Sequence, residues 1–122
     1  MMTKILENEW AYQKYFVMAH SQKEYLYIRQ LFSTTNENLE EEFKEAILHA
    51  EQTPPTKGSL TNAYQHVWGY FKKCATSEEK EKFQALLNSL PLDEEDIRSF
   101  CQNLSIKYDK KYLLQSRILF PK

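Results

Sequence analysis

Four polar side chains recur along residues 62–73 at a spacing that would place them on one face of a helix. They are Asn62, His66, Tyr70 and Lys73, at positions i, i+4, i+8 and i+11. Residues three or four apart lie next to each other on a helix surface. An amide, an imidazole, a phenol and an ammonium group in one row can bind a polar, anionic ligand. A helix that served only folding would not need this row.

A proline-containing linker, QTPPTKGS at residues 52–59, comes directly before this predicted helix. Its last residues include Lys57 and Gly58. A glycine beside the start of a helix leaves backbone N–H groups accessible to an anion. Lys57 adds a positive charge there, although lysine lacks the planar fork with which arginine binds phosphate. The linker therefore extends the predicted anion-binding row toward the N-terminus of the helix.

Three motifs follow one another along nearly the whole chain. They are KYFVMAHS at residues 14–21 with Tyr25, then Lys57-Gly58, Asn62, His66 and GYFK at 69–72, and finally Tyr112-Leu113, Gln115 and Pro121. In this order they resemble the motifs of the YbgA-like domains, a family of domains of unknown function. The chain has Lys57 where the family usually has arginine and Leu60 where it usually has histidine. It also lacks a glycine-containing segment that the family pattern would place within residues 87–99.

The resemblance implies a role beside an iron–sulfur enzyme. YbgA-like domains are commonly fused behind a cysteine-rich, desulfidase-like domain that removes sulfur from thiouracil-type bases. In such a fusion the cysteines perform the chemistry, and the helical domain holds the RNA. This chain resembles the second part alone, which implies an RNA-binding domain, with tRNA as the expected RNA. The resemblance implies either a standalone RNA binder or a domain that works with a desulfidase-like iron–sulfur protein encoded separately.

The composition predicts one cytoplasmic helical domain. The chain has 122 residues, 42% of them hydrophobic and 14% aromatic, which is enough for a packed core. Its two glycines and four prolines leave few tight turns. There is no apolar run of about 18 residues, and MMTKILENEW is charged where a signal peptide is apolar, so we expect no membrane partner. Cys74 and Cys101 stand apart, which predicts buried, reduced thiols and neither a metal site nor another cofactor.

The net charge of −1 conceals acidic and basic segments that alternate along the chain. Residues 53–76 contain three Lys or Arg and no acidic residue, and residues 101–122 contain five and one. Residues 1–52 and 77–100 are acidic. The two basic segments also carry the second and third motifs. If they meet in the fold, they form one positive surface, which is typical of a nucleic-acid-binding protein.

The apolar periodicity predicts an all-α fold, a compact bundle of six helices that forms one domain over residues 1–122. Ser21 is expected to interrupt or kink the first helix. Gly69 is expected inside the third, where another backbone would approach closely. Thr76 with Glu79, Asp93 and Asp109 are expected N-caps. Four of the expected helices span about residues 8–32, 38–51, 60–74 and 76–90. The other two begin at about residues 93 and 109.

The favoured hypothesis is the accessory RNA-binding domain. Lysines would contact phosphate, while the amide, imidazole and phenol groups would contact base or sugar. The last helix would complete this face if it packs beside the third. We predict no catalytic residue. The predicted RNA-binding residues are Lys14, His20, Lys57, Asn62, His66, Tyr70, Lys72, Lys73, Lys110, Lys111, Tyr112 and Gln115.

Two other hypotheses remain open. A small enzyme would use His66 or His20 as general acid or base, and would require His66, Asn62 and Lys57 to converge in an anion-binding pocket. A protein–protein interaction module would expose a contiguous apolar patch. Residues 118–120, with the sequence ILF, could form such a patch or could instead dock into the core.

Overall fold

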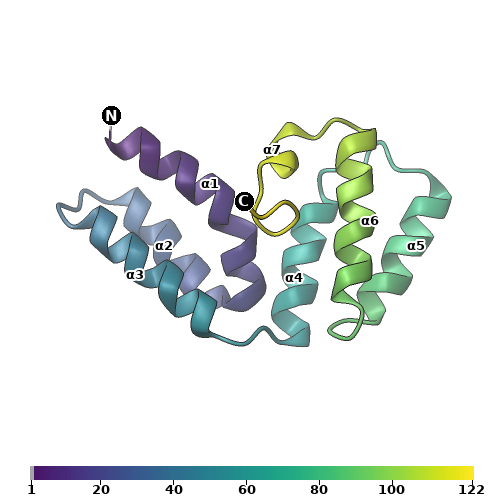
Figure 1. Cartoon of the computed structure of the whole chain (residues 1–122), viewed down its shortest axis with the longest axis horizontal. Helices are drawn as coiled ribbons and strands as arrows, with labels where there is room; N and C mark the ends of the chain where they lie inside the picture. The colour runs from purple at the N-terminus through teal and green to yellow at the C-terminus, as the bar shows by residue number, and fades with distance from the viewer. Residues whose placement is uncertain (1) are drawn as a thin grey trace.

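The computed structural model describes residues 2–122, with side chains described from Lys4 onward. It contains seven helices and, over the described residues, no strand, so the expected all-α class is confirmed. Figure 1 shows α1, α2 and α3 on one side of the molecule and α4, α5 and α6 on the other. The helices are α1 (Met2–His20), α2 (Gln22–Ser33), α3 (Leu39–Gln52), α4 (Lys57–Trp68), α5 (Ser77–Asn88), α6 (Glu94–Lys107) and α7 (Lys111–Leu114).

The described part of the chain has seven helices rather than the expected six because Ser21 divides the first predicted helix into α1 and α2. Ser21 has an extended backbone, with φ −158° and ψ 111°, and its side chain accepts a hydrogen bond from the backbone N–H of Glu24. Serine at an N-cap satisfies a donor that the first turn of a helix leaves without a partner. The chain therefore ends α1 at His20 and restarts as α2, and the predicted interruption is confirmed.

Helix α1 contributes to two hydrophobic clusters through different faces. Trp10 and Val17 pack with residues of α2 and α3, such as Ile28 and Phe43. Tyr15, Met18 and Ala19 pack instead with α4, α5, α6 and the C-terminal segment. Positions 10 and 17 lie two turns apart on one face, while positions 15, 18 and 19 lie on another. Helix α1 thus joins the two halves of the molecule seen in Figure 1.

Helix α4 begins and ends earlier than the predicted third helix, which was expected at residues 60–74. It starts at Lys57 after a capping box in which Thr56 and Ser59 each bind the other's backbone N–H. After Trp68 the chain continues in tight turns, with backbone hydrogen bonds from Tyr70 N–H to the Val67 carbonyl (3.1 Å) and from Phe71 N–H to the Trp68 carbonyl (2.8 Å). These turns direct the Phe71 side chain into the core, where it is fully buried.

Gly69 is the C-cap of α4 rather than an interior residue, so its predicted position was wrong. The expected close approach of another element was also wrong. A Cβ built on Gly69 would lie 3.1 Å from the carbonyl oxygen of His66, in the preceding turn of the same chain. Glycine at this position therefore lets the chain enter the tight turns after α4 without a close contact between a Cβ and this oxygen.

The three predicted caps of the C-terminal half have different outcomes. Thr76 and Glu79 form the expected capping box of α5. Asp93 occupies the N-cap of α6 but makes no side-chain cap hydrogen bond. Asp109 does not cap α7: its φ is 51°, in the left-handed region, and Lys110 is the N-cap. Asp109 instead lies between α6 and α7 in a left-handed backbone conformation, which aspartate tolerates better than most residues.

The C-terminal segment docks between the two halves of the molecule (Figure 1). Ile118 and Leu119 are buried and Phe120 is half-buried, so these residues form part of the core rather than an exposed patch. The backbone N–H of Arg117 donates to the Tyr12 carbonyl at 2.9 Å, which ties this segment to α1. Among the described helices, none has the length and apolar character needed to cross a membrane.

Candidate nucleic-acid interface

A cluster of three tyrosines joins α1, the turn after α4, and α7. The hydroxyl oxygens of Tyr15 and Tyr70 lie 3.0 Å apart. The rings of Tyr70 and Tyr112 stack with centroids 5.8 Å apart and an interplanar angle of 18°. Tyr15 meets both rings edge-on, at 6.2 Å from Tyr70 and 6.1 Å from Tyr112. Tyr70 and Tyr112 remain partly exposed, while Tyr15 is buried.

This tyrosine cluster brings the two basic segments of the sequence together. Tyr70 precedes Lys72 and Lys73, and Tyr112 follows Lys110 and Lys111. Figure 1 shows the end of α4, the start of α5, the end of α6 and α7 at the same end of the molecule. Lys72, Lys73 and Lys111 are exposed and Lys110 is half-buried. We call these four residues the lysine cluster.

No member of the lysine cluster forms an ion pair with a described residue, so its charges are available to an anion. The nearby Lys107 differs, because its ammonium group lies 2.7 Å from the carboxylate of Glu79. Positive charges without partners on one end of a nearly neutral protein attract polyanions, and the attraction weakens as salt screens it.

The surroundings of the tyrosine cluster favour protonated phenols. Burial raises the pKa of Tyr15 above its ordinary range, with further contributions from its hydrogen bond to Tyr70. Burial also raises the pKa of Tyr112 to about 12. At neutral pH these groups are therefore hydroxyls, which donate and accept hydrogen bonds without repelling a phosphate.

The predicted row along one helix face is divided in the structure, because α4 ends at Trp68. Tyr70 and Lys73 follow the helix and belong to the end that carries the lysine cluster. His66 remains on α4, exposed, with its ring 6.3 Å from that of Tyr15. Asn62 lies in the first half of α4, where its side-chain amide donates to the Gln22 side chain of α2 at 2.9 Å.

Asn62 lines an open polar hollow of about 590 Å³ between the starts of α2 and α4. His20 and Gly58 line it as well. The Nδ1 atom of His20 lies 2.8 Å from the Thr53 carbonyl oxygen. A carbonyl can only accept, so Nδ1 carries the proton and Nε2 is the basic nitrogen of the neutral ring. His66 and Lys57 are absent from this lining, so the pocket that the enzyme hypothesis requires does not form here.

Three further predicted residues complete the picture. Lys57 is the first residue of α4 and is exposed. The ammonium group of Lys14 lies 5.9 Å from the centre of the Trp10 ring, toward the half of the molecule that contains α2 and α3. Gln115 directly follows α7 and is exposed beside Tyr112. The predicted residues thus form two groups at opposite ends of α4 with Lys14 outside both.

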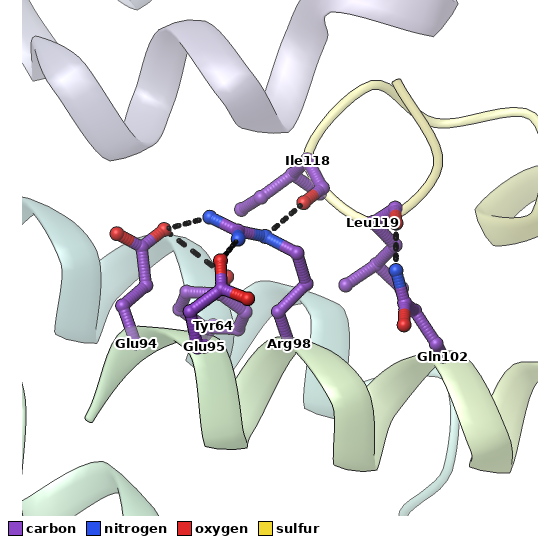
Figure 2. A network of polar contacts seen from close by, with 7 residues as sticks. All are labelled: Tyr64, Glu94, Glu95, Arg98, Gln102, Ile118 and Leu119. Atoms are coloured by element: carbon purple, nitrogen blue, oxygen red, sulfur yellow. Dashed lines mark hydrogen bonds and ion pairs between the residues drawn. The ribbon is translucent and has the colours of Figure 1, made fainter. Parts of the chain in front are cut away.

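Sequence reasoning missed the residues that hold the C-terminal segment in place. Figure 2 shows Arg98 of α6 between Glu94, Glu95 and the carbonyl oxygen of Ile118. Its Nε donates to Ile118 at 3.2 Å, and its NH2 group lies 2.8 Å from Glu94, which also accepts from the buried Tyr64 hydroxyl. Gln102 donates to the Leu119 carbonyl. The spacing of Glu94 and Arg98 at i and i+4 was the available signal for one of these pairs.

The two cysteines differ in accessibility. Cys101 is fully buried, and its burial raises the pKa of its thiol to about 12. Cys74 is half-buried, and its sulfur lies 3.5 Å from the Phe71 carbonyl oxygen. Over the described part of the chain, no group of three or more His, Cys, Asp or Glu side chains is placed to hold a metal ion.

Comparison with family models gives one match. The model of the family described as "Protein of unknown function (DUF1722)" matches residues 14–122. The match covers most of the chain, so the chain belongs to this family, which is that of the YbgA-like domains. A search of curated proteins finds no match, and a search of solved structures also finds none.

Proposed function

We propose that this chain is an accessory RNA-binding domain, with tRNA as the expected RNA. The stack of Tyr70 on Tyr112 carries the proposal, because it joins the only two basic segments of the sequence at one end of the fold. The four ammonium groups of the lysine cluster supply the phosphate contacts. Lysine and tyrosine side chains in one place are the combination with which proteins bind single-stranded and looped RNA.

The second group of predicted residues supplies a further contact on the same RNA. Lys57 and Lys73 lie near opposite ends of α4, whose 12 residues span about 18 Å at the usual rise per residue. A structured RNA is wide enough to reach both ends. Lys57 would contact phosphate, while Asn62 and His20 would contact phosphate or sugar in the hollow. His66 lies between the two groups on the same helix.

In the proposed role, this domain holds the RNA in the cytoplasm while a separate iron–sulfur protein removes sulfur from its thiouracil-type bases. The family membership supports this part of the proposal, because domains that resemble this chain are commonly fused to desulfidase-like domains. The buried, unreactive position of Cys101 suits a division of labour in which the partner supplies the reactive sulfur and this chain holds the RNA.

Fluorescence anisotropy with labelled bulk tRNA and with duplex DNA tests the proposal at low and at physiological salt. We expect saturable tRNA binding that persists at salt concentrations where duplex DNA no longer binds. The double variant Lys73→Glu/Lys111→Glu should weaken tRNA binding by about tenfold or more. It should also lower the salt slope by about 0.7–0.9 for each phosphate that the variant no longer neutralises.

A matched control distinguishes the lysine cluster from net charge. The variant Lys4→Glu/Arg29→Glu reverses two exposed charges in the α1–α2 half and changes the net charge equally. It should bind tRNA within about twofold of the wild type at physiological salt, where the Debye length is about 8 Å. Equal losses of affinity in both variants, or no tRNA binding by the wild type, would contradict the proposal.

A further inference from the structure

A second pocket lies directly beside the tyrosine cluster, between α1 and the C-terminal segment. It has a volume of about 350 Å³ and is lined by Asn8, Ala11, Tyr12, Tyr112, Gln115 and Lys122. Tyr112 therefore contacts two features at once: it stacks on Tyr70 and forms part of this pocket. Lys111 of the lysine cluster directly precedes Tyr112 in the sequence.

The lining of this pocket combines flat apolar surfaces with amide groups. Tyr12 and Tyr112 contribute aromatic rings, and Asn8 and Gln115 contribute exposed amides. Within the described residues, neither amide side chain forms a hydrogen bond, so both retain a donor and an acceptor for a ligand. Lys122 adds an ammonium group 4.7 Å from the centre of the Tyr12 ring.

The walls of the pocket are fixed by contacts within the fold. The Tyr12 hydroxyl accepts a hydrogen bond from the backbone N–H of Lys122 at 2.8 Å, and the Tyr12 carbonyl accepts from Arg117 at 2.9 Å. Tyr112 is held by Tyr70 and Tyr15. The aromatic surfaces are thus positioned before a ligand arrives, which lowers the entropic cost of binding.

We propose that this pocket takes one unpaired nucleobase of the RNA bound at the lysine cluster. This inference rests on the proposed function and adds the class of RNA: one with a base outside its helix. An unpaired base has two flat faces, which stack on aromatic side chains, and an edge of donors and acceptors, which asparagine and glutamine amides match. The Lys122 ammonium group contacts the adjoining phosphate.

Two labelled RNA hairpins of equal length test the base pocket. They share one stem, and one carries a single extrahelical nucleotide where the other carries an abasic site. We expect the wild-type chain to bind the first about fivefold to a hundredfold more tightly, the range that stacking one base provides. The double variant Asn8→Ala/Gln115→Ala removes two exposed amides and keeps the rings of Tyr12 and Tyr112, so its preference for the first hairpin should fall severalfold without disappearing.

The control variant Gln30→Ala removes an exposed amide from α2 and should keep the wild-type preference. Side-chain amide NMR resonances of Asn8 and Gln115 should shift with the first hairpin and not with the abasic one. Equal wild-type affinity for the two hairpins, or a preference as large in the double variant as in the wild type, would overturn the base pocket while leaving the proposed RNA-binding function in place. Binding to neither hairpin would overturn both.

Discussion

The hydroxyl groups of Tyr15 and Tyr70 lie 3.0 Å apart, and this contact links residues that are 55 positions apart in the sequence. It joins α1 to the turn after α4, and the stack of Tyr70 on Tyr112 extends the connection to α7. The same residues that bring the basic segments together therefore also stabilise the junction of the two halves. Burial raises the pKa of Tyr15 and of Tyr112, and it raises the pKa of the fully buried Tyr64.

The raised tyrosine pKa values predict alkaline unfolding. Above pH 10, the ordinary tyrosine pKa, the unfolded chain releases protons that the folded chain retains. The free energy of unfolding should therefore be fully retained below pH 10 and fall as the pH rises further. Each tyrosine that stays protonated in the fold contributes up to roughly 1.4 kcal/mol per pH unit, and the partly exposed Tyr112 less. Urea denaturation between pH 8 and pH 12 measures this slope.

The variant Tyr15→Phe/Tyr112→Phe should have a shallower slope above pH 10, because two of the groups that titrate on unfolding are gone. Tyr27→Phe, at a residue that is 43% exposed, is the matched control. Slopes that are the same in the wild type and the Tyr15/Tyr112 variant would show that these phenols ionise as freely in the fold as in the unfolded chain.

Local signals in the sequence predicted most of the helices, because their ends are determined by neighbouring residues. The capping box of Thr76 and Glu79 and the interruption at Ser21 depend on groups three positions apart. The end of α4 was predicted wrongly, because the spacing from Asn62 to Lys73 continues a helical pattern beyond Trp68. There the chain continues in tight turns that bury Phe71, and tertiary packing outweighs local propensity.

The candidate site could be predicted only in part for the same reason. The lysines and tyrosines are visible as residue types, and the charge pattern identifies their segments. Their proximity depends on the contact of Tyr15 with Tyr70 and on the docking of Ile118 beside Arg98, which join residues far apart in sequence. The pocket beside Tyr112 combines Asn8 with Gln115, and no spacing rule connects two positions so distant.

The different burial of the two cysteines predicts selective alkylation. Cys101 is fully buried with its thiol pKa raised to about 12, so it should not react with a maleimide or iodoacetamide in the folded protein. Cys74 is half-buried and should react slowly. Mass spectrometry should find one modification in buffer and two in urea. Cys74→Ser should abolish labelling in buffer, and modification of Cys101 without denaturant would contradict the packing of α6 against the core.

The carboxylate of Glu79 connects the start of α5 with the end of α6. It accepts hydrogen bonds from the ammonium group of Lys107 (2.7 Å), the hydroxyl of Tyr108 (2.6 Å) and the backbone N–H of Thr76 (2.9 Å). The contacts with Lys107 and Tyr108 are the main causes that lower the pKa of Glu79 from 4.5 to about 2. The unfolded chain therefore takes up a proton at a higher pH than the fold does.

This lowered pKa predicts that Glu79 stabilises the fold above pH 4.5 and that the effect is lost as the pH falls from 4.5 to about 2. Glu79→Gln retains a side chain that suits the capping box but loses the charge. Its urea midpoint should be lower than that of the wild type at pH 7, and the difference should shrink below pH 4.5. Glu81→Gln, a change at an exposed position of the same helix, is the matched control.

Arg98 holds the C-terminal segment against α6, so its removal should loosen that segment first. The side chain donates to the Ile118 carbonyl at 3.2 Å and pairs with Glu94 and Glu95 (Figure 2). Hydrogen bonds of charged groups contribute about 1.5–3 kcal/mol each. Because two of these partners are carboxylates that remain accessible to water, we expect Arg98→Leu to lower the free energy of unfolding by about 2 kcal/mol in urea denaturation.

Limited trypsin digestion locates the effect of Arg98→Leu. Arg117 is itself tied down in the fold, with its guanidinium 2.7 Å from Glu51 and its backbone N–H bonded to Tyr12. Once the Ile118 carbonyl loses its donor, cleavage after Arg117 should accelerate more than cleavage at other basic residues, because proteolysis reports local opening. Arg29→Leu removes an exposed arginine of α2 and should leave cleavage after Arg117 at the wild-type rate. Parallel acceleration at every site in Arg98→Leu would indicate global unfolding and would contradict a specific role of Arg98 in holding the segment.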